Sequence, residues 1–140
     1  MAHRLLPLVA SLLFVLPGCN FKPPQECPFT GTADTVAFSQ QFESMVLVVE
    51  GTSSPPPVED EFLQFQRDNK LELIVVSKSA GQIQVCVGEA KGGGQIAYSQ
   101  THSVTVGENR ITLGTFKPNP YVVRIAYNSI LVQNIRFRVN

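Results

Sequence analysis

The chain has 140 residues with 11 basic and 11 acidic side chains, so its formal net charge is zero. This length accommodates one domain with a sizeable hydrophobic core. The balanced charge argues against general nucleic-acid binding, because nucleic-acid-binding proteins usually present a strongly basic face.

The first 18 residues have the three-part order of a secretory signal peptide. Residues 1–4 form a short positive start, residues 5–16 are an uncharged run of 12, and Pro17-Gly18 closes the segment. A transmembrane helix needs about 20 apolar residues to cross the hydrocarbon core. The run is too short to span a membrane, so we expect residues 1–18 to be a cleaved leader.

The end of this leader, Leu16-Pro17-Gly18-Cys19, resembles the lipobox of bacterial lipoproteins. The resemblance implies that the Cys19 thiol receives a diacylglycerol, that the leader is cut before Cys19, and that the new amino group is acylated. Asn20 is not the Asp that retains enteric-type lipoproteins in the inner membrane, so the resemblance favours the outer membrane, on its periplasmic or surface face. An ordinary secretory leader, with Cys19 as a structural thiol, is the alternative.

Residues 19–33 contain several prolines and show no periodicity. We interpret them as the lipidated N-terminus followed by a tether that lifts the domain off the membrane. The domain itself is then expected to cover residues 34–140.

The three cysteines leave one unpaired in a secreted chain. If Cys19 is acylated, Cys27 and Cys86 remain as a pair. Period-two alternation puts Cys86 on the polar face of its strand, together with Gln82 and Gln84. An exposed free thiol does not persist in an oxidising compartment. We therefore predict a Cys27–Cys86 disulfide, and two separate reduced cysteines are the alternative.

From residue 34 onward, short segments of alternating apolar and polar residues are separated by turn residues, as is typical of strands. No segment after residue 20 sustains the apolar spacing of an amphipathic helix. Seven to nine short strands predict an all-β fold, an antiparallel β-sandwich of immunoglobulin-like or jelly-roll type. The expected strands are 35–42, 45–51, 61–66, 70–77, 81–88, 95–106, 110–116, 121–127 and 131–139.

The last two of these strands suggest a hairpin whose bulky side chains all point inward. A three-residue loop, 128–130, gives this register. The segment is similar to the closing hairpin of many bacterial immunoglobulin-like modules, a resemblance that covers about 20 residues and carries no activity. The expected pairs are Tyr127–Leu131, Val123–Ile135 and Tyr121–Phe137.

In this register Arg124, Arg136 and Arg138 project outward from adjacent strands. Arg124 and Arg136 become diagonal neighbours, close enough for both guanidinium groups to contact one anionic group. The alternative is a solvated face that keeps the sheet soluble and protects its edge against aggregation.

Few residues suggest catalysis or metal binding. His102 is the one histidine after the leader, and neither Ser99 nor Ser103 has the context of a nucleophile. We expect a solvated strand histidine. The acidic residues 59–61 lack calcium-loop spacing and are interpreted as a solvated loop, and residues 91–94 lack the phosphate-binding frame. No catalytic residue, metal site or cofactor is predicted.

These observations predict a non-catalytic lipoprotein that is anchored to the cell envelope through Cys19 and contacts another envelope protein. An enzyme ranks well below this, because the supply of acids, bases and nucleophiles is thin. The alternative is a module that binds a glycan or other anionic polymer through the arginine face. It ranks second because the chain has no Trp and most Phe and Tyr residues fall at inward positions.

Overall fold

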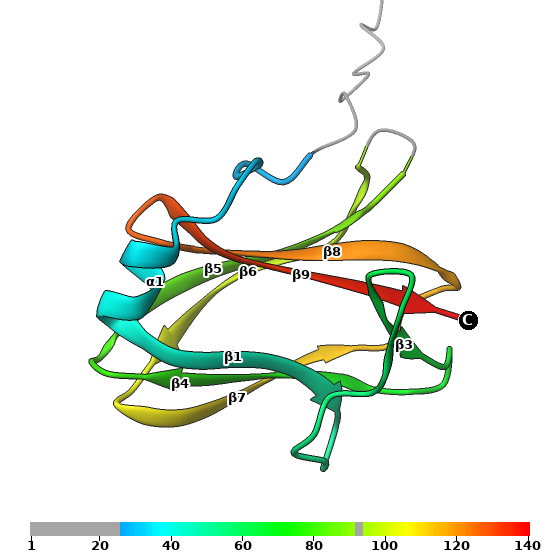
Figure 1. Ribbon diagram of the computed structural model, residues 1–140, viewed down its shortest axis with the longest axis horizontal. Helices are drawn as coiled ribbons and strands as arrows, with labels where there is room; N and C mark the ends of the chain where they lie inside the picture. The colour runs from blue at the N-terminus through cyan, green and yellow to red at the C-terminus, as the bar shows by residue number, and fades with distance from the viewer. Residues whose placement is uncertain (1–25, 92–93) are drawn as a thin grey trace, which may run out of the picture.

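A computed structural model describes residues 26–91 and 94–140, so the leader, Cys19 and the start of the tether lie outside the described residues. The described chain folds into one short helix and nine strands that form two packed layers (Figure 1). This confirms the predicted all-β sandwich. The elements are α1 (Thr35–Gln41), β1 (Phe42–Val49), β2 (Val58–Glu59), β3 (Phe62–Phe65), β4 (Leu71–Ser77), β5 (Gly81–Glu89), β6 (Ile96–Val104), β7 (Gly107–Gly114), β8 (Asn119–Tyr127) and β9 (Ile130–Val139).

The two sheets differ in size. One has three strands in the order β1-β4-β7, and the other has six in the order β2-β3-β9-β8-β5-β6. All neighbouring strands run antiparallel except β3 and β9, where Leu63 lies opposite Phe137 in a parallel pair. A parallel pair is possible here because β3 and β9 are far apart in the chain, so no hairpin turn joins them.

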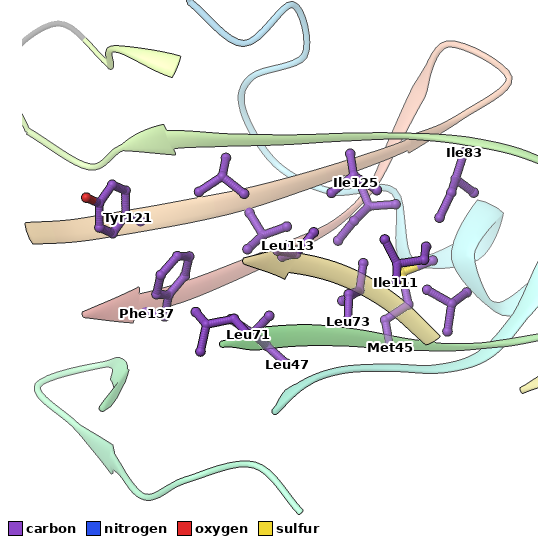
Figure 2. Close-up of a cluster of buried hydrophobic side chains, with 14 of the residues drawn as sticks. Met45, Leu47, Leu71, Leu73, Ile83, Ile111, Leu113, Tyr121, Ile125 and Phe137 are labelled. Carbon is purple, nitrogen blue, oxygen red and sulfur yellow. The ribbon is translucent and has the colours of Figure 1, made fainter. Parts of the chain in front are cut away.

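The core lies between the two sheets (Figure 2). Leu71, Leu73 and Val75 of β4 are buried against it from the small sheet. From the large sheet the inward positions of β5, β8 and β9 are buried in the same way, as the alternation predicts. Burial of each such side chain contributes about 1.5–3 kcal/mol, so the alternating pattern both defines and stabilises the sandwich.

The prediction of a first strand at residues 35–42 is wrong, because most of this segment forms the seven-residue helix α1. The side chain of Asp34 caps the helix by accepting a hydrogen bond from the Ala37 amide at 2.9 Å. Phe38 packs against Phe42, with ring centroids 5.8 Å apart. A helix this short is not stable alone, so the cap and this packing decide its conformation. Within the part of the chain that the structure describes, no helix is long and apolar enough to cross a membrane.

The β8–β9 turn also differs from the prediction. Tyr127 pairs with Ile130 instead of Leu131, so the loop has two residues, Asn128 and Ser129. Both have positive φ, 49° and 62°, which is the geometry of a type I′ turn. This turn matches the twist of the flanking strands better than a three-residue loop does, which explains why it forms.

A bulge restores the predicted register further along the hairpin. Ile125 pairs with Gln133 and Ala126 with Leu131, which leaves Val132 as the extra residue. Val132 joins the core cluster in place of Leu131. The two-residue turn and the extra residue together equal the predicted three-residue loop. The pairs Val123–Ile135 and Tyr121–Phe137 are therefore confirmed.

Candidate functional site

The three predicted arginines lie on the outer face of the six-stranded sheet. Arg124 of β8 is opposite Asn134 of β9, and Arg136 is opposite Val122. Arg124 and Arg136 are therefore diagonal neighbours, as predicted. Arg138 follows two residues later on the same face. We call Arg124, Arg136 and Arg138 the arginine face.

Two of these arginines lie against an aromatic ring that the sequence did not link to them. The guanidinium carbons of Arg136 and Arg138 lie 4.4 Å and 4.9 Å from the centroid of the Phe62 ring. Phe62 is 8% exposed although it sits on the outer side of the sheet. The sequence predicted a strand at residues 61–66, which contains Phe62. The burial of Phe62 under the arginines, however, depends on the parallel pairing of β3 with β9.

The predicted acidic loop makes one contact with the arginine face. Asp60 and Glu61 form the turn between β2 and β3, with φ of 52° and 69°. Glu61 Oε2 lies 2.8 Å from Arg136 Nη1, and their side chains are 81% and 46% exposed. An exposed ion pair contributes about 0–1 kcal/mol. The turn therefore orients Arg136 more than it stabilises the fold.

The predicted disulfide is confirmed, with Cys27 and Cys86 joined at an S–S distance of 2.02 Å. Cys86 lies opposite Arg124 across β5 and β8. Gly88 leaves room beside this bond, because a Cβ there would lie 3.4 Å from Cys27 Sγ and 3.5 Å from Arg124 Nη1. The disulfide and Arg124 therefore lie next to each other on the outer face.

Part of the predicted tether lies along the sheet. Besides the buried Cys27, the Gly31 carbonyl accepts a hydrogen bond from Asn134 Nδ2 at 2.9 Å. The Asp34 amide donates to the Leu131 carbonyl at 2.8 Å. These contacts fix residues 27–34 to the six-stranded sheet beside the arginine face.

A hollow of about 300 Å³ lies between Arg124 and Arg136, with Gly31, Ala90, Val122 and Asn134 as its other lining residues. Asn134 Oδ1 is buried and has no hydrogen-bond partner in the structure. Within residues 26–91 and 94–140, Arg124 forms no ion pair. The hollow is therefore bordered by two guanidinium groups and has no acidic lining residue.

A second hollow, of about 250 Å³, is also lined by Arg124. It is lined by Glu26 and Glu89 as well as by Lys91 and Arg124. Because its charges are balanced, it is less suited to an anion than the hollow between the two arginines.

His102 lies on β6 and is half-buried, so it is less exposed to solvent than expected. Its Nε2 lies 2.6 Å from Tyr98 Oη. Burial lowers the pKa of His102 and raises that of Tyr98. Ser103 is next to His102 along β6 and therefore points to the opposite face. Among the described residues no three His, Cys, Asp or Glu side chains are grouped as a metal site would require.

Arg110 and Tyr121 also have shifted pKa values, and their contacts serve the fold. The nearly buried Glu72 accepts a hydrogen bond from Arg110 at 2.7 Å, which raises the pKa of Arg110. Burial, together with the charge of Glu89, raises the pKa of Tyr121, whose hydroxyl donates to the Lys117 carbonyl at 2.7 Å. Neither group lies on the arginine face.

No family model and no curated protein sequence matches the chain. Among solved structures, a β-glucosidase from Listeria innocua in complex with glucose is similar over 69% of this chain and 16% of that protein, at 16% identity and a TM-score of 0.38. A β-D-glucoside glucohydrolase from Trichoderma reesei is similar over 71% of this chain and 18% of that protein, at 9% identity and a TM-score of 0.38. A GH3 β-glucosidase from Bifidobacterium adolescentis is similar over 68% of this chain and 17% of that protein, at 10% identity and a TM-score of 0.35. The chain spans less than a fifth of these proteins, and a likeness this low carries no argument about function.

Proposed function

We propose that the protein is a non-catalytic, lipid-anchored module of the cell envelope that binds another envelope protein through its arginine face. The observation that carries this proposal is the arrangement of Arg136 and Arg138 over Phe62 next to Arg124, which forms no ion pair with the described residues. Arginine and aromatic side chains are enriched where proteins bind proteins. Contact with Phe62 restricts the two arginine side chains before a partner binds. This lowers the entropy cost of ordering them when they bind a partner's carboxylates.

The covered ring also argues for a protein partner over a sugar. A sugar ring stacks on an exposed aromatic face, whereas Phe62 is 8% exposed beneath Arg136 and Arg138. The groups exposed at this surface are planar guanidinium groups, which bind carboxylates in a bidentate manner. The partner we propose therefore carries Asp or Glu side chains at the contact.

The test is a comparison of cross-linked partners from whole envelopes. Arg124→Gln removes a charge that forms no ion pair in the described part of the chain, so it probes binding with little effect on folding. Arg67→Gln removes the same charge from an exposed loop and is the matched control. The proposal predicts a protein partner that is cross-linked to the wild type and to Arg67→Gln, and is weakened in Arg124→Gln. Equal yields from all three proteins contradict it.

The anchor part of the proposal depends on Cys19. Cys19 and the disulfide-bonded Cys27 are eight positions apart in the sequence. A fully extended chain of this length spans at most about 28 Å. A lipid on Cys19 would thus hold the outer face of the six-stranded sheet within this distance of the membrane. Three acyl chains make a durable anchor, because each buried methylene contributes about 0.8 kcal/mol.

Replacing Cys19 by Ser tests the anchor. We expect Cys19→Ser to release the protein from the membrane fraction or to leave the leader uncut. The Cys27–Cys86 disulfide serves as the control for folding, because it does not involve this thiol. Membrane retention with normal processing of Cys19→Ser would rule out lipidation.

A second candidate function is binding of an anionic envelope glycan, and the hollow beside Asn134 favours it. A uronic acid offers a carboxylate to Arg124 and Arg136 and hydroxyl groups to Asn134, which lines the same hollow. Binding of isolated envelope glycans at two salt concentrations tests this function. It predicts weaker binding at higher salt and weaker binding by both Arg124→Gln and Asn134→Leu than by Arg67→Gln. Equal binding by the three variants leaves the protein partner as the remaining proposal.

A further inference from the structure

Strand β6 is a free edge of the six-stranded sheet (Figure 1). Its nine residues, Ile96–Val104, pair with β5 on one side. No described strand pairs with the other side. Every second residue there presents an unpaired backbone N–H and C=O group, the usual template for adding a strand.

This edge lacks the charged residues and prolines by which proteins often block such pairing. Residues 95–107 contain no Lys, Arg, Asp, Glu or Pro. The other edge strands are protected. β1 and β7 carry Glu43 and Glu108, and β2 has two residues that follow three prolines. Charge, proline and short length all disfavour added strands, so β6 stands out as the edge open to pairing.

The sequence of β6 is nearly symmetric about Gln100. An antiparallel pair of identical strands with its two-fold axis at Gln100 places residues at equal distances from Gln100 opposite each other. Each of the resulting pairs joins side chains of similar size or shape. The pairs are Ser99 with Thr101, Tyr98 with His102, Ala97 with Ser103, and Ile96 with Val104.

We propose that β6 pairs antiparallel with β6 of a second copy of this chain, with the two-fold axis at Gln100, so that the two large sheets form one continuous sheet. The symmetry of the strand favours a second copy over an unrelated partner, because an unrelated strand has no reason to match it. This inference does not depend on the arginine face, which involves other strands.

The inner side of β6 already orders the side chains that this pairing uses. Tyr98 Oη lies 2.6 Å from His102 Nε2 and 3.4 Å from Gln100 Oε1. Tyr98 and His102 are half-buried and Gln100 is exposed. In the dimer, Tyr98 of each copy lies opposite His102 of the other. The facing amide groups of Gln100 each supply a donor and an acceptor.

The regular part of the interface is short. A bulge between β5 and β6 leaves Ala97 without a partner of its own. Beyond it, the residues from Tyr98 onward pair with β5 in unbroken register. The central five residues, 98–102, therefore form the regular contact, and the bulge limits pairing at the outer ends.

Cysteine cross-linking of the full-length exported chain tests the arrangement. Directly opposed residues of an antiparallel pair have Cα atoms about 4.5–5.5 Å apart, which suits a disulfide. Gln100→Cys is therefore expected to give a disulfide-linked dimer, in which the peptide around position 100 is joined to its own copy. Ser103→Cys is the matched control, because this exposed position lies opposite Ala97 and far from its own copy.

Charge repulsion provides an independent readout that does not use a new thiol. Gln100→Lys places two positive charges opposite each other at the axis, and we expect the dimer dissociation constant to rise by up to about fivefold. Ser103→Lys adds the same charge away from the axis and is expected to change the constant less than about twofold. Sedimentation of the detergent-solubilised full chain measures both constants, and the native Cys27–Cys86 disulfide reports folding of each variant.

Three results overturn the proposal. One is equal cross-linking of Gln100→Cys and Ser103→Cys, which indicates random collision. Another is a monomer that Gln100→Lys does not alter. The third is a cross-link from Gln100→Cys to a different protein with no self-linked species, because the edge then serves an unrelated strand.

Discussion

The guanidinium carbon of Arg136 lies 4.4 Å from the centroid of the Phe62 ring, on the outer side of the six-stranded sheet. The same guanidinium group donates a hydrogen bond to Glu61 at 2.8 Å. Arg136 is thus part of the folded structure as well as of the exposed surface. Arg124 makes neither kind of contact among the described residues.

This difference predicts unequal stability costs for the three arginines. Arg136→Gln and Arg138→Gln each lose a cation–π contact with Phe62, which is worth about 0.5–1 kcal/mol at an exposed site. Arg124→Gln is expected to change the free energy of unfolding by less than about 0.5 kcal/mol. Urea denaturation of the three variants, with Arg67→Gln as the control, measures these changes. A cost for Arg124→Gln as large as that for Arg136→Gln would contradict the assignment.

The disulfide is expected to contribute strongly to stability. Its two cysteines are separated by 59 residues, and closing a loop of this length in the unfolded chain stabilises the fold by about 4 kcal/mol in the chain-entropy model. The double variant Cys27→Ala, Cys86→Ala should therefore lose about 2–5 kcal/mol. Guanidinium denaturation of the variant and of the oxidised wild type measures the loss. A loss below about 1 kcal/mol would show that the unfolded chain is hardly constrained by the bond.

The β8–β9 turn predicts a stabilising substitution. Ser129 has φ of 62°, a conformation that costs about 1 kcal/mol for residues other than glycine and is free of this cost in glycine. Asn-Gly is also a preferred sequence for a type I′ turn. We expect Ser129→Gly to raise the free energy of unfolding by about 0.5–1 kcal/mol. Ser103→Gly, within β6, should lower it, since glycine weakens a strand. Thermal unfolding of both variants checks the contrast.

The surroundings of His102 predict a dependence of stability on pH. Burial lowers its pKa below the usual value of 6.5, so the folded state binds a proton less readily than the unfolded state. Its contribution is therefore fully present above the unfolded pKa and decreases as the pH falls below it. His102→Gln removes this titration. Between about pH 7.5 and about pH 5.5 the wild type should lose more stability than His102→Gln. Denaturant midpoints at both pH values test this, and an identical loss in both proteins would contradict it.

Local patterns in the sequence determined most of the strands. Period-two alternation located β5 and β8 and put Cys86 on the outer face, because strand geometry alone sends neighbouring side chains to opposite sides. The same rule put Arg124 and Arg136 on one face. The count of cysteines then led to Cys27 as the disulfide partner.

Alternation along the sequence could not predict the helix α1. Residues 35–42 alternate as a strand does, and only Asp34 gave a signal for a helix cap. A helix of seven residues depends on what it packs against. In this protein that contact is between Phe38 and Phe42, and no pattern within the segment specifies it.

The tertiary structure alone decided what surrounds the arginine face. The parallel pairing of β3 with β9 joins residues more than 70 positions apart and brings Phe62 under Arg136 and Arg138. Alternation fixes which side of its own strand a residue occupies, but it contains no information on which distant strand lies beside it. The hollow next to Asn134 and the free edge at β6 follow from that strand order. The sequence by itself therefore determined the faces of the strands, and long-range packing decided which faces meet and which edge stays open.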